Sequence, residues 1–74
     1  MAADDRERLV KVAIVGSEVE ASILQDALRQ EGVHSYVRSQ TAAEPIGVPL
    51  VSSFEIFVFA RDAKRARWVI GERP

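Results

Sequence analysis

The most apolar run of the chain is 54–59, with the sequence Phe-Glu-Ile-Phe-Val-Phe. Alternation along a strand sends three apolar side chains to one face and Glu55, Phe57 and Phe59 to the other. Both faces are therefore largely apolar, and such a strand usually has neighbours at both edges. We predict that this run is the central strand of a small sheet.

The run 9–15 predicts the first strand of that sheet. Plain alternation places Val10, Val12 and Ile14 on one face and the odd-numbered residues on the other. The single charge of the run, Lys11, marks the odd-numbered face as the wetter one.

A helix is predicted directly after the first strand. Ser17 followed by Glu20 fits a capping box, and the helical period continues to about Glu31. Gly32 stands where a left-handed residue commonly ends a helix. At 100° per residue, one apolar stripe is expected to face the sheet. Its members are Ala21, Ile23, Leu24, Ala27 and Leu28.

Residues 33–38 predict the second strand, in which Tyr36 and Arg38 share a face. Residues 39–53 contain two prolines, a glycine and several small polar residues, and they predict a loop, with a short strand over 48–51 as an alternative. A loop of this length is often functional or mobile.

The last predicted element is a helix from Ala63 to about Ile70, capped by Asp62 and closed by Gly71. Helical spacing turns its small and aliphatic residues inward and places Trp68 on the opposite side. Because tryptophan is enriched in interaction hot spots, we expect Trp68 in a homo-oligomer or partner contact. The alternative is that the indole packs on its own helix over the stem of Lys64, or on the end of the chain.

The order strand, helix, strand, strand, helix predicts one α+β domain over 9–74, after a disordered tail over 1–8. A right-handed crossover makes the first two strands parallel, and the third enters between them. The result is a ferredoxin-like β-α-β-β-α arrangement with a three-stranded sheet in the order 1-3-2 and both helices on one face.

The predicted arrangement leaves one strand edge without a strand partner and one sheet face without a helix. The first strand has an open edge, and such edges invite pairing with another chain. The face without helices carries more aromatic surface than a monomer usually leaves in water. The candidate interaction residues on it are Lys11, Tyr36, Arg38, Phe57 and Phe59, with Ala13, His34 and Glu55 beside them.

The amino-acid composition limits the size of the domain and excludes several kinds of functional site. The 74 residues suffice for one marginally stable domain, and oligomerisation is a common source of extra stability at this size. The chain has no cysteine and one histidine, His34, so we expect no metal site, no cofactor and no catalytic residue. The formal charge of −1 argues against a nucleic-acid partner.

No apolar run approaches the roughly 20 residues of a membrane span, and no secretion signal opens the chain, so we expect a cytoplasmic location.

Motifs along almost the whole chain resemble a family of small bacterial proteins described as putative prokaryotic signal-transducing proteins. The resemblance covers about residues 9–70. The matching segments are Leu9–Ala13, Gly16–Ala21, Leu28, Glu31–Val33, Tyr36–Arg38, Phe54–Val58, Asp62–Ala63 and Ala66–Arg67.

The resemblance implies a compact α/β domain with a distant likeness to the nitrogen-regulatory signal transducers. Those proteins are ferredoxin-like trimers that bind nucleotides through long loops. This chain is too short for their double β-α-β unit and has no Gly-rich phosphate loop, so no nucleotide site is transferred to it.

Three further patterns have an ordinary interpretation beside a functional one. Gly16-Ser17 could hold a phosphate at a helix start, but capping explains it. The aromatic and basic residues of the open face could stack RNA bases, but Glu55 would repel phosphate and the RNA-binding strand signature is missing. The basic cluster of the last helix is a solvated face or the docking site of an acidic partner. The cluster is Arg61, Lys64, Arg65 and Arg67.

We therefore predict a non-enzymatic signalling or protein-interaction module that self-associates through the open sheet face or the edge of the first strand. The alternative is a sensor of a nucleotide or metabolite that uses the 39–53 loop. An enzymatic role has few candidate acids and bases, since paired carboxylates and cysteines are missing.

Overall fold

The computed structural model describes residues 7–43 and 49–72, and of residues 41–43, 49–52 and 72 it describes the backbone. The elements follow one another in the predicted order. They are β1 (Leu9–Val15), α1 (Glu18–Gln30), β2 (Ser35–Ala43), β3 (Pro49–Phe59), the 3₁₀ turn η2 (Ala60–Asp62), α2 (Ala63–Arg67) and the π-helical turn η3 (Trp68–Glu72).

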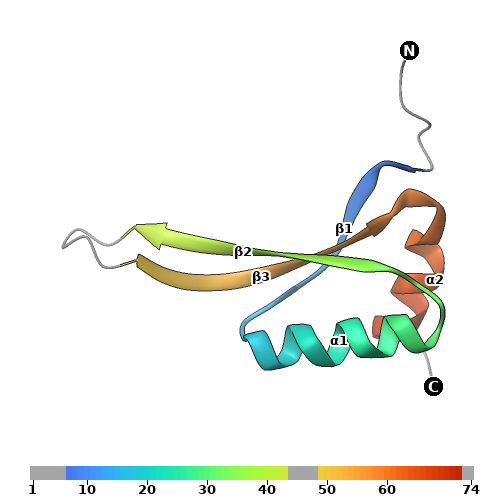
Figure 1. Ribbon diagram of the computed structural model, residues 1–74, viewed down its shortest axis with the longest axis horizontal. Helices are drawn as coiled ribbons and strands as arrows, with labels where there is room; N and C mark the ends of the chain where they lie inside the picture. The colour runs from blue at the N-terminus through green and yellow to red at the C-terminus, as the bar shows by residue number, and fades with distance from the viewer. Residues whose placement is uncertain (1–6, 44–48, 73–74) are drawn as a thin grey trace, which may run out of the picture.

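The sheet has the order β1-β3-β2, and β3 is antiparallel to both of its neighbours. The central position predicted for 54–59 is confirmed, as is the α+β arrangement with a three-stranded sheet in the order 1-3-2. Both helices lie on the same side of the sheet (Figure 1).

The core lies between the sheet and the two helices. Its largest fully buried side chains are Leu28, Val33, Ile56 and Val58. Small residues of the helices, Ala21 and Ala66 among them, let the helix backbones approach the sheet closely. At the start of β1, the carbonyl of Arg8 accepts a hydrogen bond from the N–H of Ala60 at 2.7 Å. A disordered tail was predicted over residues 1–8, and residues 1–6 of that segment lie outside the described residues.

A β-bulge interrupts β1 between Lys11 and Ala13. The extra residue reverses the alternation from there on, so that Ala13 pairs with Ile56 and packs against the core. Ile14 is consequently turned to the other face of the sheet and is 57% exposed. The predicted placement of Ile14 on the helix-covered face and of Ala13 on the open face is therefore wrong.

Helix α1 begins and ends as predicted. The Oγ of Ser17 accepts a hydrogen bond from the N–H of Glu20 at 3.1 Å. At the other end Gly32 has a φ of 78°, and the N–H of Val33 returns to the carbonyl of Leu28 at 2.9 Å, which is the Schellman arrangement. The apolar stripe predicted to face the sheet included one residue too many, because Ile23 is 62% exposed.

Strands β2 and β3 form a hairpin that is longer than predicted. Residues 39–43 belong to β2 and residues 49–53 to β3, so the prediction of a loop over 39–53 is wrong for both segments; residues 44–48 lie outside the described ones. The two prolines and the glycine suggested a loop, but one of these prolines, Pro49, begins β3, where a missing N–H is well tolerated.

The β2–β3 hairpin projects well beyond the helices (Figure 1). The last pair between β1 and β3 joins Val15 to Phe54, so residues 49–53 of β3 pair with β2 alone. We call this two-stranded part, residues 40–43 and 49–53, the arm. Two-stranded ribbons are marginal in water when they stand alone, so the arm depends on its root in the sheet.

The C-terminal helical region starts one turn earlier than predicted, with η2. Asp62 makes no side-chain capping hydrogen bond, so its predicted role as a cap is wrong. The inward positions were predicted correctly, because Ala63, Ala66 and Val69 are buried. Trp68 lies on the outer side and is 42% exposed.

Candidate functional site

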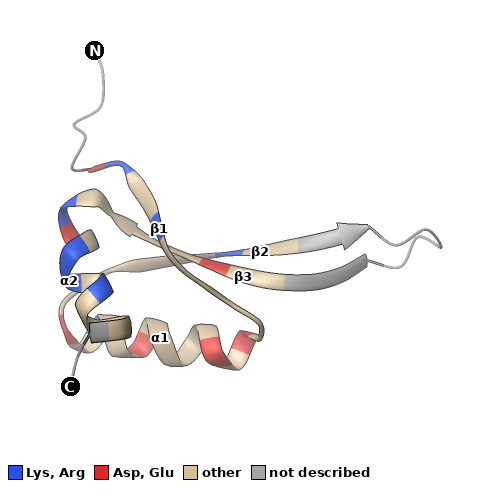
Figure 2. Cartoon of the chain, turned by 180° about the vertical axis from the view of Figure 1, so that it is seen from behind, with Lys and Arg blue, Asp and Glu red and all other residues tan. Residues whose placement is uncertain are grey.

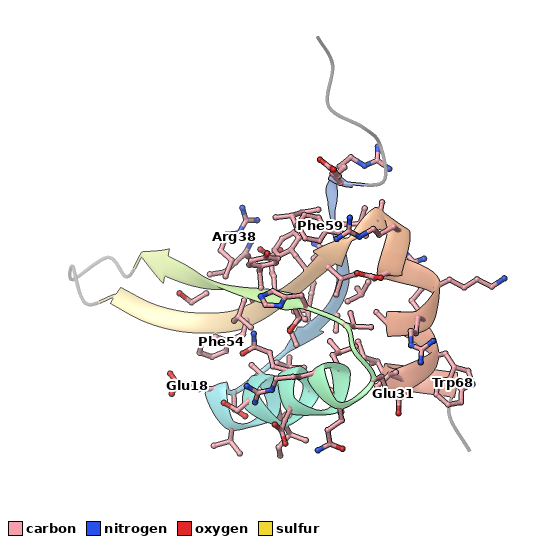
Figure 3. The ribbon with its side chains drawn as sticks, turned by 45° about the vertical axis from the view of Figure 1, so that its right-hand side comes forward. Glu18, Glu31, Arg38, Phe54, Phe59 and Trp68 are labelled. Carbon is pink, nitrogen blue, oxygen red and sulfur yellow. The ribbon has the colours of Figure 1, made fainter. Side chains whose placement is uncertain are left out.

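The sheet face opposite the helices collects the residues that carry the candidate site. We call it the open face. Pairing in the sheet sets Phe57 between Lys11 and Tyr36, and it sets Glu55 between Ile14 and Arg38. Figure 3 shows Arg38 and Phe59 on the side of the sheet away from α1. The open face consists of Leu9, Lys11, Ile14, Tyr36, Arg38, Glu55, Phe57 and Phe59.

An ion-pair network around a buried carboxylate lies at the centre of the open face. The Oε1 of Glu55 accepts hydrogen bonds from Nε and Nη2 of Arg38 at 2.9 and 2.7 Å. Its Oε2 accepts one from Nζ of Lys11 at 3.1 Å. The side chain of Glu55 is 4% exposed, although neither α1 nor α2 lies above it. The two long cationic side chains and their neighbours therefore enclose this carboxylate.

The hydrogen bond from Arg38 is the largest cause that lowers the pKa of Glu55 below its ordinary value of 4.5, and burial partly opposes it. The hydrogen bond from Lys11 lowers the same pKa further. Because a hydrogen-bonded carboxylate stays ionised, the network holds one negative and two positive charges on this face.

Aromatic rings of the open face lie beside the network, and one of them contacts it directly. The guanidinium of Arg38 lies 5.2 Å from the ring centroid of Phe57, and that of Arg61 lies 4.9 Å from the centroid of Phe59. Tyr36 meets Phe59 edge to face, with 5.8 Å between the centroids. Contacts of these types hold the rings and cations in defined positions.

Aliphatic side chains complete the open face. Leu9 and Ile14 are 46% and 57% exposed, and Tyr36 is 40% exposed. Leu9 pairs with Phe59 at one end of the face, and Ile14 lies near the other end. A surface of exposed apolar groups around fixed charges is suited to binding, since aromatic residues and arginine are enriched at protein interfaces.

The sequence indicated much of this surface. Lys11, Tyr36, Arg38, Phe57 and Phe59 lie on it together, as the alternation predicted. Ile14 was not predicted there, because the bulge is invisible to a period of two, and Leu9 was not recognised as part of the surface. His34 is exposed, and its ring lies 5.4 Å from that of Tyr36.

Trp68 lies apart from the open face, at a hollow on the outer side of α2. Figure 3 shows it next to Glu31 and far from Arg38. Arg65 crosses the hollow, donating from Nε to the backbone carbonyl of Glu31 at 3.0 Å and from Nη2 to its Oε1 at 3.4 Å. We call this the Trp68 hollow. Its lining residues are Glu31, Arg61, Asp62, Lys64, Arg65 and Trp68.

Neither a metal site nor a membrane-spanning helix occurs in the part of the chain that the structure describes. Over residues 7–43 and 49–72, no group of three or more His, Asp or Glu side chains is arranged to hold a metal ion. Within the same ranges, no helix has both the length and the apolar character that a membrane crossing requires.

Comparisons with known proteins return one family. No curated protein and no solved structure matches the chain significantly. The model of a family described as "Putative prokaryotic signal transducing protein" matches residues 9–73, which include every described helix and strand. The chain therefore belongs to the family of putative prokaryotic signal transducing proteins.

Proposed function

We propose that this chain is a non-enzymatic signalling domain that acts by binding protein, and that it self-associates through the open face. One observation carries the proposal. Leu9, Ile14 and Tyr36 are each at least 40% exposed on a sheet face that neither helix covers. Exposed apolar patches rimmed by polar residues mark interaction sites.

A second copy of the chain is the occupant that fits best. Two copies of one surface pair around a two-fold axis, which is the commonest symmetry of soluble oligomers. The carboxylate at the centre of the open face is already paired with Lys11 and Arg38, so association would leave no unpaired buried anion. A domain of this size also gains stability from a partner.

Pairing through the edge of β1 is the other route to self-association. The outer edge of β1 has no strand partner among the described residues, since β1 pairs with β3 alone. Hydrogen–deuterium exchange separates the two routes. Edge pairing protects the β1 amides that point away from β3, whereas pairing through the open face leaves them to exchange.

The non-enzymatic part of the proposal is supported by the state of the polar groups. Glu55, the buried carboxylate of the open face, is held by two cations and is therefore a poor general base. His34 is exposed and its partner is a tyrosine ring rather than a carboxylate. The ligand-sensor alternative depended on a loop over 39–53, most of which is strand, and we do not retain it.

A matched pair of substitutions tests self-association. Ile14→Glu places a charge on the open face, and Ile23→Glu places the same charge on the outer side of α1, where the exposed fraction is nearly equal at 57% and 62%. Both variants are expected to fold, because both side chains already contact water. Sedimentation equilibrium is expected to give a dimer for the parent and for Ile23→Glu, and a monomer for Ile14→Glu.

A parent chain that sediments as a monomer at all concentrations would contradict self-association. A parent dimer that persists in Ile14→Glu while the β1 amides are protected would move the interface from the open face to the strand edge. Far-UV circular dichroism of both variants confirms that any change in mass is not a loss of fold.

A further inference from the structure

The Trp68 hollow lies outside the surface assigned to self-association. Its lining combines one large exposed aromatic side chain with three cations and two carboxylates, so the hollow carries net positive charge. Figure 2 shows the concentration of basic residues along α2, in contrast to the acidic residues at the start of α1. Apart from Arg61, whose guanidinium also lies over the ring of Phe59, the lining residues make no printed contact with the open face.

The exposure of Trp68 is the first argument for a ligand. The indole is 42% exposed, while the other face of the same helical segment is buried through Ala66 and Val69. Leaving a large aromatic surface in water is unfavourable, and tryptophan is prominent among the residues that dominate binding energy. The alternative that the indole is covered by its own helix is disfavoured by this exposure.

The second argument is the state of the cations. Arg65 is held by Glu31, and Arg61 lies over the ring of Phe59 and near Asp62. Lys64 forms no hydrogen bond or ion pair with any described residue, although it lines the same hollow. One cation is therefore ready to pair with an incoming anion beside the indole.

We propose that the Trp68 hollow binds an acidic protein segment that carries one large apolar side chain. The apolar side chain packs on the indole of Trp68, and neighbouring carboxylates of the segment pair with Lys64 and with the exposed edge of Arg65. Backbone N–H groups of the segment supply donors for the carboxylates of Glu31 and Asp62. An extended acidic peptide thus satisfies both signs of charge in the lining.

A nucleotide fits the same lining less well. A di- or triphosphate requires several unoccupied donors, whereas two of the three cations of the hollow are already engaged. The carboxylates of Glu31 and Asp62 would also repel concentrated phosphate charge. Stacking of a base on the indole is therefore opposed by the electrostatics around it, and the acidic peptide is favoured.

The chain contains its own reporter for the experiment, because Trp68 is its only tryptophan. The probe is a synthetic peptide in which one leucine is flanked on each side by three glutamates. Titration is expected to produce a saturable blue shift of the indole emission, and the anisotropy of a dye on the peptide is expected to rise in parallel. Added salt is expected to weaken the binding.

Two substitutions on the same helix separate specific from general attraction. Lys64→Gln removes the unpaired cation of the hollow, and Arg67→Gln removes an equal charge that does not line it. We expect Lys64→Gln to weaken binding about fivefold, the upper range for one exposed ion pair. Arg67→Gln is expected to change it less than about twofold. Trp68→Ala, followed through peptide anisotropy, is expected to weaken it about tenfold or more.

The proposal is overturned if the acidic peptide gives no saturable change, or if a peptide with lysines in place of the glutamates binds equally well. Equal losses in Lys64→Gln and Arg67→Gln would also overturn it, because they indicate unspecific attraction to a basic surface. Saturable binding of ATP without binding of the peptide would assign the hollow to a nucleotide instead. Ile14→Glu leaves every lining residue of the hollow in place and is expected to bind the peptide saturably as a monomer, so the presence of binding is tested separately from self-association.

Discussion

At the residue scale, Glu55 stands out as the buried charged side chain among the described residues. It lies on a sheet face that neither α1 nor α2 covers, and it is nonetheless 4% exposed. Its two cationic partners remain partly in water, with 65% of the Arg38 side chain and 45% of the Lys11 side chain exposed. Long side chains can cover a neighbour with their stems while their charged heads stay hydrated.

This arrangement predicts a specific dependence of stability on pH. Because the pKa of Glu55 in the folded chain is below its ordinary value of 4.5, the network stabilises the fold fully above that value. The stabilisation is lost as the pH falls through the lowered pKa. Glu55→Gln is therefore expected to melt at a lower temperature than the parent at neutral pH, and this gap is expected to shrink on acidification.

The melting temperatures are best compared as differences, since other carboxylates titrate in the same range. Glu7→Gln removes an exposed carboxylate away from the network and serves as the control. A gap between Glu55→Gln and the parent that stays constant down to strongly acidic pH would contradict the role assigned to the ion pairs.

The sequence predicted that the residues of this network share a face but did not predict the contacts between them. Alternation predicted that Glu55, Lys11 and Arg38 share a face, because they occupy equivalent positions in three separate strands. It did not predict that both cations meet the same carboxylate, since that depends on the register of β3 against two neighbours. Register is set by the whole sheet and is not encoded in any one strand.

At the scale of the element, the end of α1 illustrates how one residue type fixes a boundary. Gly32 has a φ of 78°, which an L side chain adopts only with strain. A methyl group added at this glycine would meet no atom within 4 Å, so the cost of a substitution lies in the backbone conformation alone.

Two glycine substitutions are expected to act in opposite directions. Gly32→Ala is expected to lower the free energy of unfolding by about 1 kcal/mol, the typical penalty of the left-handed conformation. Gly71→Ala, in the helical turn η3 and without a positive φ, is expected to raise it by roughly 0.5 kcal/mol through better helix propensity. Urea denaturation measures both, and a stabilising Gly32→Ala would contradict the role of the cap.

The elements that failed as predictions failed for identifiable reasons. Helix α1 has local signals at both ends, so its bounds followed from Ser17 and Gly32. The strand segments of the arm have no such local signals. Their small polar residues adopt an extended backbone conformation because each strand pairs with the other. The bulge in β1 likewise arises from pairing with β3, and a plain period of two places Ile14 on the wrong face.

At the scale of the whole molecule, the sheet order was predictable from few observations. A strand that is apolar on both faces belongs in the centre, and a right-handed crossover fixes the direction of its two neighbours. Self-association was predicted from the same order, because that order leaves one sheet face without a helix and the edge of the first strand without a strand partner.

The proposed self-association predicts that stability depends on protein concentration. If the dimer forms through the open face, the melting temperature of the parent is expected to rise with concentration, because mass action favours the associated folded state. The melting temperature of Ile14→Glu is expected to be independent of concentration over the same range. A parent whose melting temperature does not change with concentration would contradict a dimer that is coupled to folding.

Arg61 belongs to both surfaces of the molecule. Its guanidinium lies 4.9 Å from the ring centroid of Phe59 on the open face, and the same side chain lines the Trp68 hollow. If both proposed contacts form, a ligand of the hollow that moved Arg61 would alter the open face, and by reciprocity dimerisation would alter binding in the hollow by the same free energy. Through this one arginine, the two contacts would then act as an input and an output.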